Sequence, residues 1–189
     1  VVGGTSYAPG EAVATIETDS TGRAATAADA LPFGTYTVHE TKAPEGYLLN
    51  SDWEKTVSIT EDGKILELQG DDACADQVKR GDLSFVKEDG TTSARMADIP
   101  FKITSKTTGE WHIAVTDANG ILDTAAAQYP HTQSTNANDA AVKDDGTFDD
   151  TKIVRDAGIW FAGTKDGSSD PDDSKGALPY DVYTIEELS

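Results

Sequence analysis

The sequence predicts an all-β protein. Short runs rich in valine, isoleucine, threonine and aromatic residues are separated at close spacing by glycine, aspartate, asparagine and proline. This pattern is typical of a β-sandwich or a β-barrel. Aromatic residues make up 7% of the chain and hydrophobic residues 37%, so each core should be thin and formed by sheets. No segment keeps a helical period for more than about one turn, which residues 125–128 are expected to form.

One ten-residue stretch occurs twice. Residues 31–40, Leu-Pro-Phe-Gly-Thr-Tyr-Thr-Val-His-Glu, return as residues 178–187, Leu-Pro-Tyr-Asp-Val-Tyr-Thr-Ile-Glu-Glu. A second repeat precedes each copy, because Thr-Asp-Ser-Thr-Gly at 18–22 matches Thr-Asp-Ala-Asn-Gly at 116–120. Two landmarks in the same order indicate one structural unit used twice.

The repeat divides the 189 residues into two predicted modules, residues 1–75 and 76–189. The acidic stretch 70–81 has no periodicity and is interpreted as the connector. In the second module about 50 residues separate the two landmarks, which is too long for an ordinary surface connection. We therefore predict an insertion over residues 125–176.

Alternation of polar and apolar residues predicts the strands of the first module. They are residues 13–18, 35–40, 53–60 and 64–68, the last two joined by a hairpin turn at 61–63. The inward rows are Tyr36, Val38 and Glu40 in one strand, and Trp53, Val57 and Ile59 in another, where Lys55 also falls inward.

The same alternation predicts the strands of the second module, which are residues 82–88, 100–104, 111–116 and 183–187. Their inward rows are Leu83, Phe85 and Lys87; Phe101 and Ile103; Trp111, Ile113 and Val115; and Tyr183, Ile185 and Glu187. The insertion is mostly polar, and residues 131–139 and 166–174 would be disordered in isolation. The apolar run 157–162 is expected to be a strand or an anchor, with Trp160 and Phe161 holding the insertion to the sandwich.

Composition excludes several classes of function. A formal net charge of −19 argues against nucleic acid and against an anionic membrane surface as partners. The acidity indicates solubility, with calcium attraction by the loops at 144–150 and 170–173 as the alternative. Cys74 is the single cysteine, so no disulfide forms within the chain, and no apolar run is long enough to cross a bilayer. The first residues do not resemble a translation start, and we expect a piece of a longer protein.

The three histidines predict no metal site. No two of them have the spacing of zinc ligands, and Cys74 has no cysteine partner. His39 and His112 fall on the faces opposite the apolar rows, so solvent exposure is expected for both. No cofactor is expected.

Lys87 and Glu187 each end an inward apolar row of the second module. Burial of an isolated ammonium or carboxylate favours its neutral form. A neutral amine is a nucleophile, and a protonated carboxyl can polarise a carbonyl group, so the two could form an amide with a neighbouring Asn or Asp. The alternatives are a buried ion pair and a lysine that reaches solvent.

Residues 31–47, which continue as Thr-Lys-Ala-Pro-Glu-Gly-Tyr, resemble the E-box of the Cna protein B-type, SpaA-like domains of Gram-positive surface proteins. The stretch 81–89 resembles the first strand of such a domain, and the second module is similar to the VaFE-type repeats of actinobacterial cell-wall-anchored proteins. The resemblance implies two tandem prealbumin-like, immunoglobulin-like β-sandwiches. It also implies autocatalytic Lys–Asn or Lys–Asp isopeptide bonds, with Lys87 as the amine and Glu40 and Glu187 as promoting acids.

The chain departs from that pattern in both modules. The family's acceptor follows the E-box on a last strand, whereas this sequence ends at Ser189, and the first module's lysine strand would lie before Val1. Asp71 and Asp72 stand where the first module's acceptor is expected. We therefore expect no intra-domain isopeptide bond of the usual arrangement, and a mass lower by one water or ammonia would contradict this.

The resulting functional prediction is a non-enzymatic stalk or pilin-like module of a secreted, cell-wall-anchored adhesin, with neighbouring modules of the same protein as partners. The alternative is a ligand-binding adhesin module that uses the insertion to bind a host glycan or an extracellular protein. In that alternative Trp160 and Tyr129 stack on a sugar. Its hydroxyls are bound by Asn136, Asn138 and Asp139.

Overall fold

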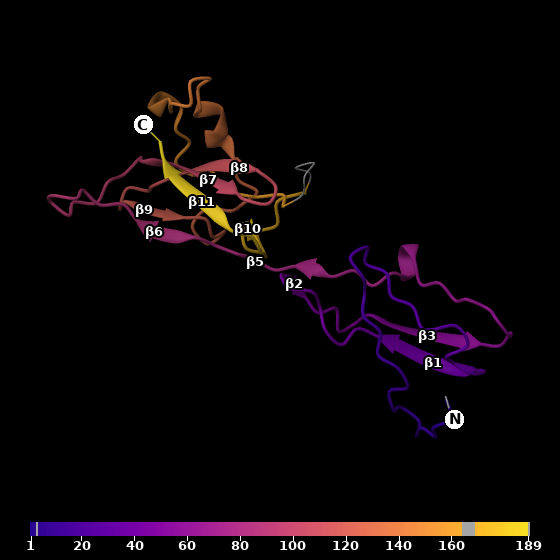
Figure 1. Cartoon of the computed structure of the whole chain (residues 1–189). Helices are drawn as coiled ribbons and strands as arrows, with labels where there is room; N and C mark the ends of the chain where they lie inside the picture. The colour runs from indigo at the N-terminus through magenta and orange to yellow at the C-terminus, as the bar shows by residue number, and fades with distance from the viewer. Residues whose placement is uncertain (3, 164–168, 189) are drawn as a thin grey trace. The chain divides into compact units, whose positions relative to one another are not determined.

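The computed structural model describes residues 1–2, 4–163 and 169–188, which form two compact units. Unit 1 comprises residues 1–43 and 49–77, and unit 2 comprises residues 44–48 and 78–189. Regular structure in the described residues consists of strands and three 3₁₀ turns (Figure 1), which confirms the all-β prediction. None of the described helices is long and apolar enough to cross a membrane.

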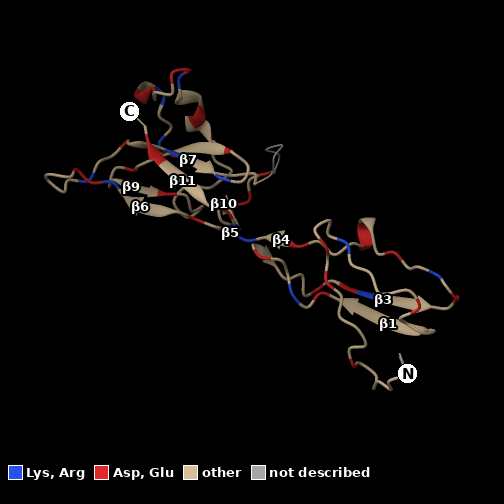
Figure 2. Cartoon of the chain, in the orientation of Figure 1, with Lys and Arg blue, Asp and Glu red and all other residues tan. Residues whose placement is uncertain are grey.

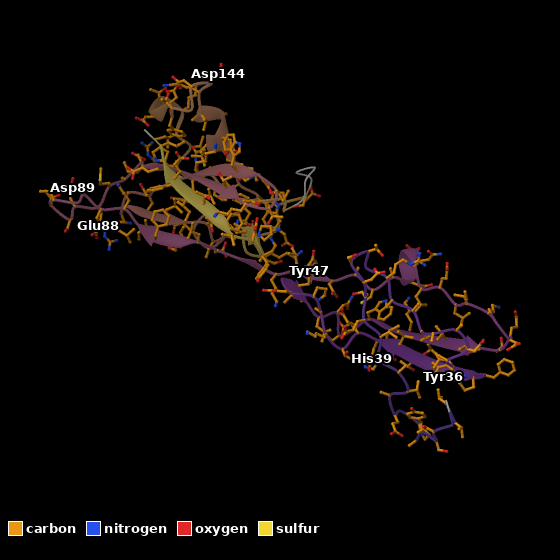
Figure 3. The ribbon with its side chains drawn as sticks, in the orientation of Figure 1. Tyr36, His39, Tyr47, Glu88, Asp89 and Asp144 are labelled. Atoms are coloured by element: carbon orange, nitrogen blue, oxygen red, sulfur yellow. The ribbon has the colours of Figure 1, made fainter. Side chains whose placement is uncertain are left out.

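Unit 1 is built on one antiparallel pair, β1 (Gly34–His39) with β3 (Glu54–Ile59). Threonine, valine and tyrosine favour this pairing because branched and aromatic side chains pack well on a pleated surface. The predicted inward rows are confirmed, since their members are half-buried and their neighbours are exposed. On β1, for example, Tyr36 is half-buried and His39 is exposed; both are labelled in Figure 3.

Two strands predicted for unit 1 are wrong. Residues 13–18 and 64–68 make no ladder, and Ile65 is 82% exposed. A strand needs a neighbour to accept its backbone hydrogen bonds, and the described residues supply none to these segments. The predicted connector also differs from the structure, because it contains a 3₁₀ turn and two short strands: η1 (Gly70–Asp72), β4 (Gln77–Val78) and β5 (Arg80–Gly81).

Unit 2 is a sandwich of two sheets. One sheet has the order β11-β7-β8, and the other pairs β6 with β9 (Figure 1). Their bounds are β6 (Ser84–Val86), β7 (Pro100–Ser105), β8 (Trp111–Val115), β9 (Ile121–Asp123) and β11 (Tyr183–Glu187). Two short strands complete the unit, β2 (Tyr47–Leu48) and β10 (Leu178–Pro179), the latter paired with β5.

The core of unit 2 lies between these sheets. Phe101 and Ile103 of β7 are buried there, as predicted, and pack with Leu122 and Phe161. The row predicted for β8 lies on the opposite face, because the register sets Phe101 opposite Ala114 and Lys102 opposite Ile113. Ile113 instead belongs to a second cluster with Ala141 and Phe148 of the insertion. The insertion therefore covers the outer face of this sheet, which explains why both faces of β8 are apolar.

The insertion is ordered where the structure describes it. It contains η2 (Ala137–Ala141) and η3 (Asp150–Lys152). Trp160 is 5% exposed and Phe161 is fully buried, which confirms that these residues anchor it, although the apolar run forms no strand. The Arg80 guanidinium donates to the carbonyl oxygens of Phe161, Gly176 and Ala177 and stacks on the Trp160 ring.

Acidic side chains lie along both units and concentrate in loops and turns (Figure 2). Many accept hydrogen bonds from the backbone two residues ahead. For example, Asp145 Oδ1 accepts a hydrogen bond from the Thr147 N–H at 3.0 Å, the pattern of an Asx-turn. This usage accounts for part of the acidity by turn formation, in addition to solubility.

Candidate functional site

The two copies of the repeat adopt the same local structure. Tyr36 Oη donates to the Pro32 carbonyl at 2.8 Å, and Tyr183 Oη donates to the Pro179 carbonyl at 2.7 Å. Each hydroxyl fixes the turn that leads into its strand. The rows that follow differ in burial, because Glu40 is half-buried in unit 1, whereas Ile185 and Glu187, predicted to face inward, are exposed in unit 2.

The upstream landmark is repeated as well. Asp19 Oδ1 accepts the N–H groups of Thr21 and Arg23, and Asp117 Oδ1 accepts those of Asn119 and Ile121. These bonds lower the pKa of both aspartates, with the Thr21 hydroxyl as the largest cause for Asp19. The repeat seen in the sequence is thus a repeat of turn geometry.

In unit 2 the structure brings Lys87 and Glu187 together. Lys87 Nζ lies 2.7 Å from Glu187 Oε2, the lysine directly after β6 and the glutamate at the end of β11. Their side chains are 26% and 45% exposed, so the expectation of a dry interior is wrong. The pair is a partly solvated ion pair. The turn that carries Glu88 and Asp89 follows the lysine (Figure 3).

In unit 1 Glu40 lies beside Asp76 and Cys74. One side-chain ligand atom of each lies within 4.8 Å of the other two. The Asn50 N–H donates to Glu40 Oε2 at 3.2 Å, and Asn50 Nδ2 donates to the Ala75 carbonyl at 2.9 Å. Asn50 therefore holds the glutamate and the segment around Asp76 against each other.

The electrostatics of this pair favour a shared proton. Burial raises the pKa of Glu40, and the adjacent Asp76 raises it further, against the lowering effect of the Asn50 N–H. Asp76 Oδ1 is buried and has no hydrogen-bond partner among the residues that the structure describes. A protonated Glu40 would satisfy this oxygen, since two close carboxyls cannot both ionise without cost.

The acceptor candidates named from the sequence do not reach Glu40 by any described contact. Asp72 instead pairs with Lys55, whose Nζ lies 2.6 Å from Asp72 Oδ1, and Asp71 is exposed. Sequence reasoning missed Asp76 because it lay in the presumed connector. One pattern could have found it, because Asp76, Val78 and Arg80 alternate as half-buried residues with exposed neighbours.

The trio of Glu40, Cys74 and Asp76 offers three donor atoms close enough for one metal ion. Metal binding needs a thiolate. Burial raises the pKa of Cys74, and the carboxylates of Glu40 and Asp76 raise it further. The charges present therefore disfavour the metal-binding form, and the arrangement suits a proton-sharing carboxyl pair better.

The residues predicted to bind a glycan make internal contacts in unit 2. The Trp160 ring is buried, with Arg80 Cζ 3.7 Å from its centre. Asn136 bonds the Trp160 backbone, Asn138 bonds the Val154 backbone, and Asp139 accepts the Ile113 N–H. Tyr129 is half-buried.

A cavity of about 290 Å³ lies beside Trp160. Its polar lining consists of Glu110, His112, Thr135, Asn136 and Ser169. His39 is exposed as predicted, whereas His112 is not, because the insertion covers its strand. His131 is fully buried, and its Nε2 lies 2.9 Å from the Lys175 carbonyl.

Comparison with known proteins gives one match. Residues 4–73 match the family model of the SpaA prealbumin-like fold domain. No curated protein and no solved structure matches the chain. The match supports a structural module of the pilin and adhesin type of surface protein. Residues 4–73 are thus similar to the SpaA prealbumin-like fold domain, which is consistent with the Cna-B-type, SpaA-like resemblance of the sequence.

Proposed function

We propose that this chain is a stalk segment of a secreted, cell-wall-anchored surface protein, and that it serves a mechanical rather than an enzymatic role. The SpaA match of residues 4–73 and the repeated turn-and-strand unit support this proposal. A thin sandwich gains little from its core, so a covalent link between strands would add resistance to unfolding. The site for such a link is the second part of the proposal.

The observation that carries the proposed link is the Glu40–Asp76 pair. The proton that the pair shares moves from Glu40 to the Asp76 carboxyl, and a neutral lysine amine attacks the carboxyl carbon of Asp76 and forms a C–N bond. The C–OH bond of Asp76 breaks, and its oxygen leaves as water. The ionised Glu40 takes a proton from the amine nitrogen and passes it to the departing hydroxyl, so the products are the amide, water and an ionised Glu40.

Unit 2 indicates how the lysine would be presented. Lys87 follows β6, a strand whose Phe85 packs edge-on against Phe101 at 4.9 Å, and its amine reaches Glu187. By the repeat, a strand of this type would place an amine beside Glu40. In this proposal Lys87 and Glu187 are the amine and the acid of a second link.

The test is reaction in trans with a synthetic peptide of residues 81–88, which carries Lys87 in its native flanks. We expect a covalent adduct whose mass is the sum of chain and peptide less one water. Asp76→Ala should abolish the adduct, Glu40→Gln should slow its formation, and the matched variant Asp71→Ala should leave it unchanged. An adduct that survives in Asp76→Ala, or no adduct in the wild type, would refute Asp76 as acceptor.

Ligand binding by the insertion is the second candidate, favoured by the cavity beside Trp160. Deleting the insertion is unsuitable as a test, because Ile159 and Phe161 belong to the core of unit 2. Thr135→Trp instead fills the cavity from its half-buried wall. If a glycan array detects binding by the wild type that Thr135→Trp loses while unit 2 stays folded, the candidate is supported. Absence of wild-type binding would remove it.

A further inference from the structure

His112 lies between two carboxylates from different parts of unit 2. Its Nδ1 is 2.7 Å from Asp139 Oδ2, and its Nε2 is 3.1 Å from Glu110 Oε1. Asp139 belongs to η2 of the insertion, whereas Glu110 directly precedes β8. The side chains of His112 and Glu110 are only 15% and 13% exposed, so water screens these contacts little.

A carboxylate at each ring nitrogen favours the protonated imidazolium form of His112. A neutral imidazole carries one N–H, so one of its nitrogens would direct a lone pair at a carboxylate oxygen. An imidazolium donates from both nitrogens and satisfies both acids. Burial lowers the pKa of His112, but the bonds and charges of Asp139 and Glu110 raise it by more, with a net upward shift.

The two acids also hold the insertion through its backbone. Asp139 Oδ1 accepts the Ile113 N–H at 2.8 Å. Glu110 accepts the Ala162 N–H at 2.6 Å and the Gly163 N–H at 2.9 Å. Through these acids His112 links η2, β8 and the segment of the insertion at Ala162 and Gly163.

Three other groups surround this cluster. Asn136 Nδ2 lies 3.2 Å from His112 Nε2, and the Phe161 ring meets the imidazole edge-on at 4.7 Å between centres. The Arg80 cation of β5 interacts with Glu110. After deprotonation Asn136 can donate to Nε2, but Glu110 Oε1 then faces a lone pair and loses its donor.

We propose that His112 is a pH-dependent link between the insertion and β8. Its protonated ring holds Asp139 and Glu110 in place, and its deprotonation loosens the segments of the insertion around Asp139 and around Ala162 and Gly163. The sign follows from the upward shift. The contribution is complete below the ordinary histidine value of 6.5 and is lost as pH rises through the higher value in the folded protein.

The test is amide hydrogen exchange of the full chain from about pH 6 to about pH 9, corrected for intrinsic rates. We expect protection of residues 137–142 and 159–163 to fall as pH rises through the raised pKa of His112. His112→Gln should remove this dependence. His39→Gln, which changes an exposed histidine of β1, should retain it. The same pH dependence in His112→Gln would overturn the proposal.

A second measurement holds even if His112→Gln does not fold. In the wild type, the ring signals of His112 should titrate by NMR with a midpoint above 6.5, and Glu110→Gln should lower that midpoint. A wild-type midpoint at or below 6.5 would overturn the proposal. Both outcomes are independent of whether unit 1 forms an isopeptide bond.

Discussion

Asp181 shows how one residue distinguishes the two copies of the repeat. The first copy has Gly34 at this position. Asp181 accepts the Ser105 hydroxyl at 2.5 Å and the Thr107 hydroxyl at 2.7 Å, so it ties the turn before β11 to the end of β7. Partial burial raises the pKa of Asp181, but these hydrogen bonds lower it by more, to about 2.

The lowered pKa predicts a pH window. Because the pKa of Asp181 is depressed in the folded protein, its contribution is present above about pH 4 and is lost as pH falls towards 2. We expect Asp181→Asn to lower the urea midpoint of unit 2 at neutral pH and to weaken its pH dependence between these values. Asp144→Asn is the matched control, since Asp144 is exposed on the insertion (Figure 3). Equal pH dependence in both variants would contradict the assignment.

At the scale of elements, the strands were predictable where alternation coincides with a paired neighbour. The inward rows of β1, β3 and β7 follow from period-2 patterns because one face of each strand is less exposed than the other. The row of β8 was assigned to the wrong face, since alternation identifies two faces but does not tell which one a distant insertion will cover. Lys87 and Glu187 were matched from their places at the ends of rows, whereas Asp76 was missed because it lies in the stretch 70–81 that was interpreted as the connector.

The insertion depends on one close approach of backbones. Its Gly158 lies against Pro130, and a Cβ there would stand 2.0 Å from the Pro130 carbonyl oxygen. Gly158→Ala should therefore displace the apolar run and cost about 2 to 3 kcal/mol of unit 2 stability. The measurement is chemical denaturation followed by tryptophan fluorescence. Gly90→Ala, where a Cβ meets nothing within 4 Å, should change stability little. Equal effects would show that the contact is not needed.

At the scale of the whole molecule, the two units differ in how they are stabilised. None of the described residues of unit 1 is buried. In unit 2, Ile103, Ile113, Leu122 and Phe161 are fully buried. Apolar burial is the main favourable term in folding, so unit 1 depends more on its turns and strand pairing.

This difference predicts unequal protection within one chain. Amides of β1 and β3 should exchange by local opening at lower free energy than amides of β7 and β8. Hydrogen exchange at neutral pH, corrected for intrinsic rates, measures this directly. Ile103→Ala should lower protection in β7 and β8 and leave β1 unaffected, since the two units are separately compact. Equal protection of all four strands in the wild type would contradict the inference.

The thiol beside Glu40 and Asp76 gives the chain its own chemical reporter. Cys74 is exposed and is the single cysteine of the sequence, so a maleimide dye would attach at one place without any engineered change. Its neighbours hold back the thiolate, and thiolate abundance sets the alkylation rate. A lysine ammonium that binds between Glu40 and Asp76 would offset their negative charge and favour the Cys74 thiolate. The dye would then react faster, so the rate of labelling would report whether a lysine is bound at the carboxyl pair.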